Sequence, residues 1–189
     1  MADLLEELAG VGYPVASVAD LRSSGTRYRA AVPVLLRWLD RSEDTFEKEE
    51  IIRALSVPWA RDDALDPLVA LFRSAPLTGQ ENELLRWAIG NALEVLWADS
   101  RFDELVALAR DASFGKAREM IVLGLGRSKR SEASEVLIEL LDDPVVSGHA
   151  VKALRKLKVP EARPALQRML DDDRAWVRKE AQRALAALD

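Results

Sequence analysis

Apolar residues recur three or four positions apart along this chain, in two kinds of segment that alternate. The first kind has a small residue followed by leucine, with another apolar residue three positions earlier. These pairs are Ala54-Leu55, Ala92-Leu93, Gly124-Leu125, Ala153-Leu154 and Ala184-Leu185. The second kind has a leucine with apolar residues three and four positions later, as in Leu35, Trp38 and Leu39. Each pattern lines one side of a helix. The pattern therefore predicts two types of helix, which we call first-type and second-type helices.

The two helix types repeat with a regular period. The leucines of the first-type helices are separated by 38, 32, 29 and 31 residues. A period of this length with two helices per unit indicates a solenoid, because each hairpin can cover its apolar sides only by stacking on its neighbours. We predict an all-α, right-handed α-α superhelix of about five helical hairpins. It is expected to form one domain over residues 1–189, with an irregular N-terminal cap and first repeat in 1–41 and regular repeats in 42–189.

The N-terminal region and the prolines give more local predictions. Residues 2–8 are expected to form a short helix, 14–22 a second and 28–41 a third. Pro33, Pro67 and Pro164 are predicted in the first turn of second-type helices, where a missing backbone N–H removes no helical hydrogen bond.

Charge and composition exclude several classes of protein. The net charge is −5, and residues 1–95 hold 10 basic and 16 acidic residues. Nucleic acid is not an expected partner, because phosphate neutralisation needs a basic surface. The chain has no cysteine, which excludes disulfides and thiolate sites. No apolar run approaches the roughly 20 residues that span a bilayer, and the first ten residues have no lysine or arginine for a signal peptide. We expect a cytoplasmic protein without membrane contact.

Several segments resemble the HEAT-like repeat of the phycobilisome-lyase type. They are Val177-Arg178-Lys179-Glu180-Ala181, Leu85-Arg86 before Ile89, and Arg118 before Ile121. The motif Pro-x-Leu-x-x-x-Leu-Asp at residues 33–40 and 164–171 also resembles the second helices of that family. The resemblance implies a protein-binding scaffold, since only a minority of such families have acquired chemistry. The repeat at Val146-Ser147 departs from the pattern because it lacks the arginine.

The second-type helices carry the first candidate binding surface. In solenoids of this kind these helices usually line the concave face, and offsets of four and seven residues place their charges on one strip. The candidate residues are Arg37, Asp66, Arg73, Asp103, Arg110, Glu135, Glu139 and Arg168. The alternative interpretation is a charged face that is simply solvated.

Two further patterns allow a binding or a structural interpretation. Trp59 and Trp97 occupy equivalent places 38 residues apart, and this edge could anchor a partner or fill gaps between hairpins. Arg86, Arg118 and Arg178 form a column that could bind an anion. They could instead make a structural ladder with aspartates at helix ends.

Candidate chemistry is sparse. His149 is the only histidine, which excludes metal centres built on repeated His-Glu pairs. A site built on carboxylates alone stays open, but no motif indicates one, and neither metal nor cofactor is expected. We predict a non-catalytic scaffold or adaptor for a protein partner, with a regulator or inhibitor as one version. It is expected to be a monomer, or a weak homodimer through the apolar terminal repeat. The alternative is a HEAT-like enzyme of the alkylpurine DNA glycosylase or bilin lyase type. HEAT-like alkylpurine DNA glycosylases use a Trp, an Asp and an Arg, and Trp97, Asp99 and Arg101 resemble that set in sequence only.

Overall fold

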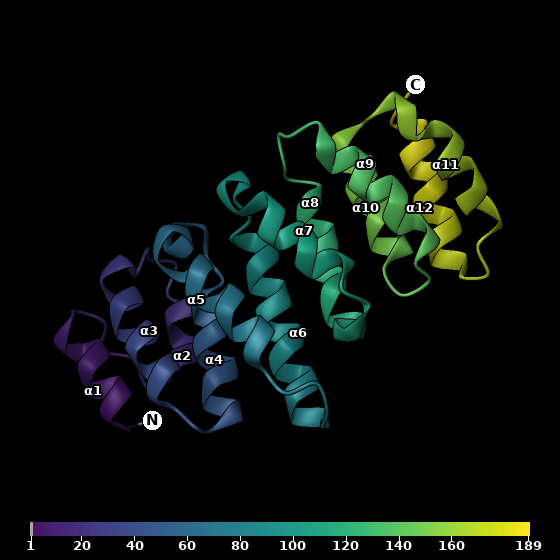
Figure 1. Ribbon diagram of the computed structural model, residues 1–189. Helices are drawn as coiled ribbons and strands as arrows, with labels where there is room; N and C mark the ends of the chain where they lie inside the picture. Colours follow the sequence, from purple (N-terminus) through teal and green to yellow (C-terminus); the bar gives the residue numbers. More distant parts are fainter. Residues whose placement is uncertain (1) are drawn as a thin grey trace. The chain divides into compact units, whose positions relative to one another are not determined.

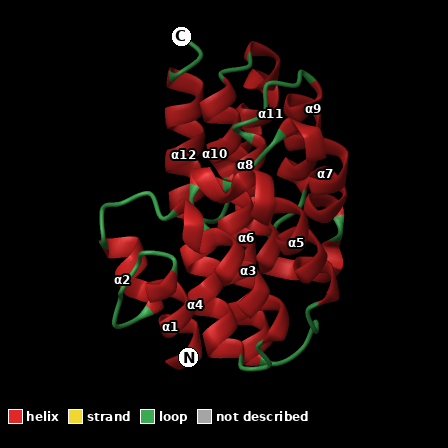
Figure 2. Cartoon of the chain, turned by 90° about the vertical axis from the view of Figure 1, so that its left-hand side faces the viewer, coloured by secondary structure: helices red, strands yellow, loops and turns green. Residues whose placement is uncertain are grey.

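The structure is a computed structural model that describes residues 2–189. Helices joined by short loops make up this described part, which contains no strand (Figures 1 and 2). No helix within it has both the length and the apolar character needed to cross a membrane. The chain divides into two compact units, Met1–Leu96 and Trp97–Asp189, which are described separately below. The single domain expected from the sequence stays a prediction.

The first unit packs its helices in pairs around a leucine-rich core. α4 contacts α2, α3 and α6, and α5 contacts α3 and α6, while α1 lies against α3 (Figure 1). The buried positions include the predicted first-type residues Ile51, Ala54 and Leu55, each fully inaccessible. The elements are α1 (Ala2–Gly10), α2 (Val18–Ser23), η1 (Arg29–Ala31), α3 (Val32–Arg41), α4 (Thr45–Leu55), η2 (Pro58–Ala60), α5 (Arg61–Ser74) and α6 (Gln80–Val95).

Local capping explains where the first unit departs from the predicted boundaries. α2 begins at Val18 rather than residue 14, because Ser17 and Asp20 form a capping box. The Ser17 N–H donates to Asp20 Oδ2 over 2.9 Å, and the Asp20 N–H donates to Ser17 Oγ over 3.3 Å. The predicted first-turn position of Pro67 is wrong. α5 already begins at Arg61, where two aspartates in the first turn favour a helix start, so Pro67 lies inside the helix.

The second unit has the more regular repeat. α10 lies between α8 and α12 and contacts both (Figure 1), so three first-type helices pack in succession. Gly126 ends α8 so close to α10 that a Cβ there would lie 2.9 Å from the Ala153 Cα. The elements are η3 (Asp99–Arg101), α7 (Phe102–Arg110), η4 (Ala112–Arg118), α8 (Glu119–Leu125), α9 (Glu132–Glu139), η5 (Leu140–Asp142), α10 (Ser147–Leu157), η6 (Pro160–Ala162), α11 (Arg163–Arg168), η7 (Met169–Asp171) and α12 (Ala175–Ala186). The glycine that follows α8 thus permits close packing against α10.

The arginine column joins each first-type helix to the end of the preceding second-type helix. Arg118 is 1% exposed; its Nη1 donates to the Ala109 carbonyl over 3.0 Å and its Nη2 to Asp143 Oδ2 over 2.8 Å. Arg86 donates to the carbonyls of residues 75 and 76, and Arg178 to those of residues 172 and 173. Ala109 lies in the last turn of α7 and the other carbonyls follow the end of a helix, where helical hydrogen bonds no longer supply a donor. The structural role of the column at helix ends is confirmed, and the predicted pairing with an aspartate is confirmed for Arg118.

The repeat without an arginine receives one from the next repeat. Arg174 Nη1 donates to the Pro144 carbonyl, and its Nη2 donates to Ser147 Oγ, each over 2.6 Å. Asp172 accepts from Nε and Nη2 of the same guanidinium and holds it in place. Four of the five N–H donors of Arg174 therefore have partners. The departure seen at Val146-Ser147 in the sequence is compensated across the repeat boundary.

Candidate functional site

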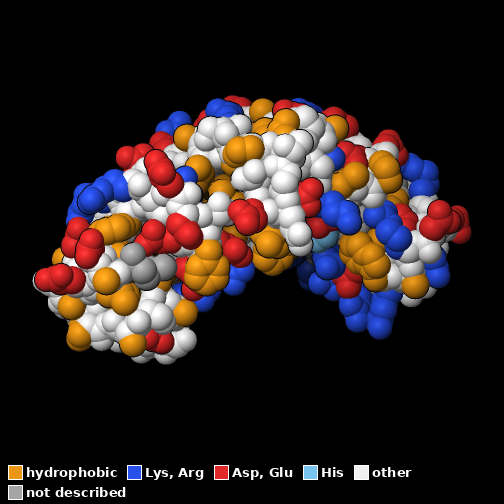
Figure 3. All heavy atoms as spheres, turned by 90° about the horizontal axis from the view of Figure 1, so that it is seen from below, with side chains coloured by type: hydrophobic (Ala, Val, Ile, Leu, Met, Phe, Trp, Pro, Cys, Tyr) orange, Lys and Arg blue, Asp and Glu red, His pale blue; other side chains and the backbone are white. Residues whose placement is uncertain are grey.

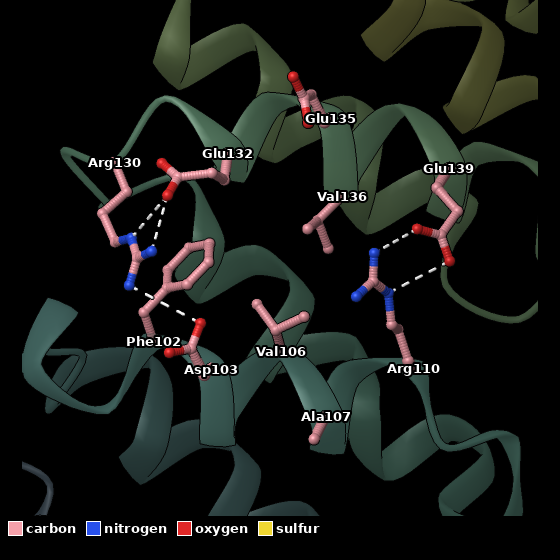
Figure 4. A pocket seen from close by; sticks show the side chains of 10 residues that line it. All are labelled: Phe102, Asp103, Val106, Ala107, Arg110, Arg130, Glu132, Glu135, Val136 and Glu139. Atoms are coloured by element: carbon pink, nitrogen blue, oxygen red, sulfur yellow. Dashed lines mark hydrogen bonds and ion pairs between the residues drawn. The ribbon is translucent and has the colours of Figure 1, made fainter.

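A groove of about 570 Å³ opens between α7 and α9 of the second unit (Figure 4). We call it the α7–α9 groove. It is lined by Phe102, Asp103, Val106, Ala107, Arg110, Arg130, Glu132, Glu135, Val136 and Glu139. The two helices are second-type helices of neighbouring repeats, so the groove lies on the surface that the sequence indicated for binding.

The floor of the groove is apolar. Phe102, Val106 and Val136 are only 4–5% exposed, because the same helix sides also face the core of the second unit. Ala107 is exposed and its small side chain leaves room above the floor (Figure 4). A long side chain laid in the groove would bury its methylene groups against this surface.

Three glutamates of α9 form one rim. Glu132, Glu135 and Glu139 stand at intervals of three and four residues, which places them on the same side of the helix. Their carboxylates lie along the groove, with Glu135 between the other two in sequence (Figure 4). All three are exposed. The rim therefore presents a row of negative charge above the apolar floor.

An arginine–glutamate pair closes one end of the groove. Arg110 stands at the end of α7, and its Nε and Nη2 donate to the two oxygens of Glu139, the former over 3.2 Å. The pair is two-pronged, which fixes the direction of both side chains. Both remain about half exposed, so the pair adds little to stability and leaves Glu139 accessible.

A second arginine–glutamate pair closes the other end. Arg130 Nη2 donates to Glu132 Oε1 over 2.7 Å, and its Nη1 lies 3.7 Å from Asp103 Oδ1. The guanidinium carbon lies 4.4 Å from the centre of the Phe102 ring, in a cation–π contact. The hydrogen bond from Arg130 lowers the pKa of Glu132 to about 2, so Glu132 is ionised at neutral pH.

Glu135 differs from its neighbours. Within residues 2–189 it has no ion-pair partner, although it is exposed at the middle of the rim. The lining contains four carboxylates and two guanidinium groups, which leaves the groove with a net charge of −2. An exposed, unpaired carboxylate over an apolar floor favours a ligand that carries a positive charge on an aliphatic stem.

The structure brings together four of the eight residues predicted for the strip. Asp103, Arg110, Glu135 and Glu139 all line the groove. Arg168 lies on α11, 3.8 Å from Asp142, and does not line it. The other three belong to the first unit: Arg37 pairs with Glu7 over 2.8 Å on α3, and Asp66 and Arg73 are exposed on α5. The role of all eight in binding stays a prediction.

Six lining residues were not among the predicted site residues, and three of them, Phe102, Arg130 and Glu132, form the contacts at one end of the groove. Phe102 was hidden because it begins α7 and reads as an ordinary core residue. Arg130 and Glu132 come from the start of α9 and the loop before it, and their meeting depends on the path of that loop. The i, i+3 spacing of Glu132 and Glu135 was the available signal.

The two tryptophans of the predicted edge make packing contacts. Trp97 is 4% exposed, and its Nε1 donates to Asp99 Oδ1 over 3.1 Å. Trp59 is half-buried and meets Tyr28 edge to face, with ring centres 5.4 Å apart. Trp59 also lines a pocket of about 350 Å³ in the first unit. These are the contacts of the packing interpretation, and partner binding through this edge stays a prediction.

The carboxylate of Asp99 is fully engaged inside the second unit. It accepts from Trp97 Nε1, from Ser128 Oγ over 2.7 Å and from the Lys129 N–H over 2.9 Å. Burial alone would raise the pKa of Asp99, but these three hydrogen bonds hold it below its usual value. Asp99 therefore joins η3 to the loop before α9 and supports the wall of the groove.

Comparisons with known proteins agree on the fold. Residues 102–186 match the family described as HEAT repeats. A designed armadillo repeat protein, YIII(Dq)4CqI, is similar over 98% of this chain and 100% of its own, with a TM-score of 0.61 and 20% identity. A second, YIII(Dq.V1)4CPAF in complex with peptide (KR)4, covers 98% and 99%, with a TM-score of 0.63 and 22% identity. A further engineered protein covers 97% of this chain and 53% of its own, with a TM-score of 0.53 and 22% identity.

At these identities the solved structures show the fold alone. The comparison with curated proteins finds no match. The phycobilisome-lyase subtype is not resolved by these matches and stays a prediction. The repeated helix pairs, the arginine column and the match of residues 102–186 to HEAT repeats agree with one another, and the chain has the all-α solenoid fold of the armadillo and HEAT repeats.

Proposed function

We propose that this chain is a non-catalytic binding protein whose α7–α9 groove holds an extended, basic segment of a partner protein. The observation that carries the proposal is Glu135, an exposed carboxylate without an ion-pair partner in the described part of the chain, above the apolar floor. A lysine or arginine of the partner would place its aliphatic stem over Val106 and Val136 and its charged end beside Glu135.

The surroundings of Glu135 favour a ligand with more than one positive charge. Glu132 and Glu139 lie on either side of it in α9, each held by an arginine, so their positions are fixed before a ligand arrives. Each carboxylate still has lone pairs that can accept a further hydrogen bond. A segment with basic residues at alternate positions could contact the row without the rim reorganising, which keeps the cost of association low.

The fold supports this use of the surface. One of the similar designed armadillo repeat proteins is in complex with the peptide (KR)4, so that protein binds an alternating basic peptide. We bring the same ligand chemistry to this chain because its groove has a net negative lining. A regulator or inhibitor would be one version of this function, in which holding the basic segment lowers the activity of the partner.

The test is binding of a fluorescently labelled (KR)4 peptide to the full chain, followed by anisotropy. We expect Glu135→Lys to weaken binding by about tenfold or more, because it replaces an attraction with a repulsion, and Glu135→Gln to weaken it by a smaller factor. Glu161→Lys is the matched control, since Glu161 is also an exposed glutamate of the second unit but lies outside the groove.

Two results would contradict the proposal. If Glu161→Lys and Glu135→Lys weaken binding equally, the peptide responds only to the net charge of the chain. A scrambled-charge peptide of alternating glutamate and lysine should bind more weakly than (KR)4. If it binds as tightly, the groove does not recognise positive charge.

A further inference from the structure

A second surface of the second unit carries an exposed tryptophan among cations. Trp176 stands in the first turn of α12 and is 42% exposed. The Lys152 Nζ of α10 lies 4.9 Å from its ring centre, and Lys179 lies three residues further along α12. We call Trp176, Lys152, Lys179 and the adjoining His149 the Trp176 patch. Figure 3 shows lysine and arginine side chains gathered beside the single histidine, together with hydrophobic atoms.

The indole of Trp176 packs on α10 with one side of its ring. It lies on the backbone of α10 at Gly148, where a Cβ would come within 2.1 Å of the ring. The ring of His149 meets it at an angle of 62°, with centres 5.8 Å apart. The glycine at this place therefore makes room for the ring in the position that it occupies. An aromatic side chain that is packed on one side and exposed on the other has few rotamers left to lose when a ligand covers it, which is typical of residues that anchor partners.

The cations of the patch differ in what they can still bind. Arg174, whose guanidinium carbon lies 5.8 Å from the Trp176 ring centre, already donates to Asp172, Ser147 and the Pro144 carbonyl. Lys152 and Lys179 form no ion pair within 4.0 Å in the part of the chain that the structure describes, although Lys152 acts on the Glu119 carboxylate at longer range. The available donors are thus the Lys152 ammonium over the indole and the Lys179 ammonium about one helical turn further along α12. Glu119 lies near this group and is half-buried, and burial raises the pKa of its carboxyl.

We propose that the Trp176 patch docks an acidic peptide segment of a partner protein, with carboxylates beside Lys152 and Lys179 and an apolar side chain on the indole. The charge of the patch selects a negative ligand, and the tryptophan selects one with apolar surface. A nucleic acid fits less well. Phosphate recognition relies on several cations and on the two-pronged guanidinium, and Arg174 is already engaged.

The Trp176 patch is independent of the α7–α9 groove. The groove is built by second-type helices and has a negative lining, whereas the patch is built by first-type helices and carries positive charge. Together they would let one chain hold two segments of opposite charge. Failure of one site would leave the other unaffected, so the two proposals can be tested separately.

The experiment measures anisotropy of a labelled peptide of alternating glutamate and leucine on the full chain at low salt. We expect Lys152→Glu and Lys179→Glu each to weaken binding by about fivefold or more, and Trp176→Ala to weaken it by a similar factor. Lys129→Glu is the matched control, because only the backbone N–H of this exposed lysine is engaged. It should change binding by less than about twofold. Glu161→Lys, outside both the groove and the patch, should leave the affinity for the acidic peptide within about twofold of that of the unchanged chain.

Several results would overturn the inference. Equal losses in Lys152→Glu and Lys129→Glu would show that only net charge matters. Tighter binding of a single-stranded oligonucleotide of the same charge would assign the patch to nucleic acid. A concentration-dependent dimer that Lys152→Glu abolishes would assign it to a second copy of the chain. Circular dichroism of each variant separates loss of binding from loss of fold; if Trp176→Ala unfolds, Trp176→Phe takes its place and should bind more weakly.

Discussion

Replacing Arg118 tests the claim that the arginine column holds the repeats together. Arg118→Met keeps most of the volume of the side chain but removes its hydrogen-bond donors. The carbonyl of Ala109 loses a partner at 3.0 Å, that of Gly115 one at 3.1 Å, and the Asp143 carboxylate one at 2.8 Å. A buried acceptor left without a partner costs about 1 kcal/mol or more, and a partly buried carboxylate left without its cation costs a similar amount or more. We therefore expect the free energy of unfolding to fall by about 3 kcal/mol.

The measurement is urea unfolding at pH 7, followed by far-UV circular dichroism. For a chain of 189 residues a loss of this size corresponds to a decrease in Tm of about 6–12 °C. Arg110→Met is the control, because its pair with Glu139 is exposed at the surface and should contribute less than about 1 kcal/mol. The reasoning fails if Arg118→Met costs no more than Arg110→Met. The reasoning also fails if Asp143→Asn lowers the free energy of unfolding by the same amount in the Arg118→Met variant as in the unchanged chain, because Arg118 and Asp143 would then not be coupled.

Two further predictions concern the second unit. Burial, helped by nearby cations, lowers the pKa of His149 to about 4, so the unfolded chain takes up a proton below about pH 6.5 that the folded chain does not. The contribution of His149 to the free energy of unfolding should be fully present above that pH and should fall by about 1–2 kcal/mol between pH 7 and pH 5. The free energy of unfolding of His149→Gln should lack this decrease. Glu119, whose pKa is raised, changes the free energy of unfolding in the opposite direction, and it does so equally in both proteins. If the two slopes are equal, His149 is not the source. Asp99→Ala should lower the free energy of unfolding by about 2–3 kcal/mol, because the buried indole N–H of Trp97 and two other donors lose their acceptor. It should also change the near-UV circular dichroism of the tryptophans, and an unaltered spectrum would contradict the role of Asp99.

The repeat architecture was predictable because it rests on short-range periodicity. A small residue followed by leucine, recurring every 29 to 38 residues, marks the close packing of first-type helices. The structure buries these positions, for example Ala153 and Leu154 at 0–1% exposure. Boundaries were harder to predict. Pro67 usually marks a first turn, yet α5 extends before it because the preceding tight turn and acidic residues start the helix earlier.

The site was predictable only as far as one helix determines it. Offsets of four and seven residues placed Asp103 and Arg110 on one side of α7, and the same rule placed Glu135 and Glu139 on α9. The partner of Arg130 depends on the loop before α9, which no helical rule describes. Arg174 reaches back from the next repeat to Ser147, 27 residues away in sequence. Contacts across loops and repeats depend on tertiary geometry, and these are the ones that the pattern missed.

The most direct test of the central claim is to map the (KR)4 peptide onto the chain by NMR. Amide signals of the isotope-labelled protein would be followed as the unlabelled peptide is added. The account predicts shifts confined to residues 102–110 and 130–139, the two segments that line the α7–α9 groove, with the side of α12 that carries Trp176 unchanged. Shifts centred outside these segments, or no shifts at millimolar peptide, would contradict it.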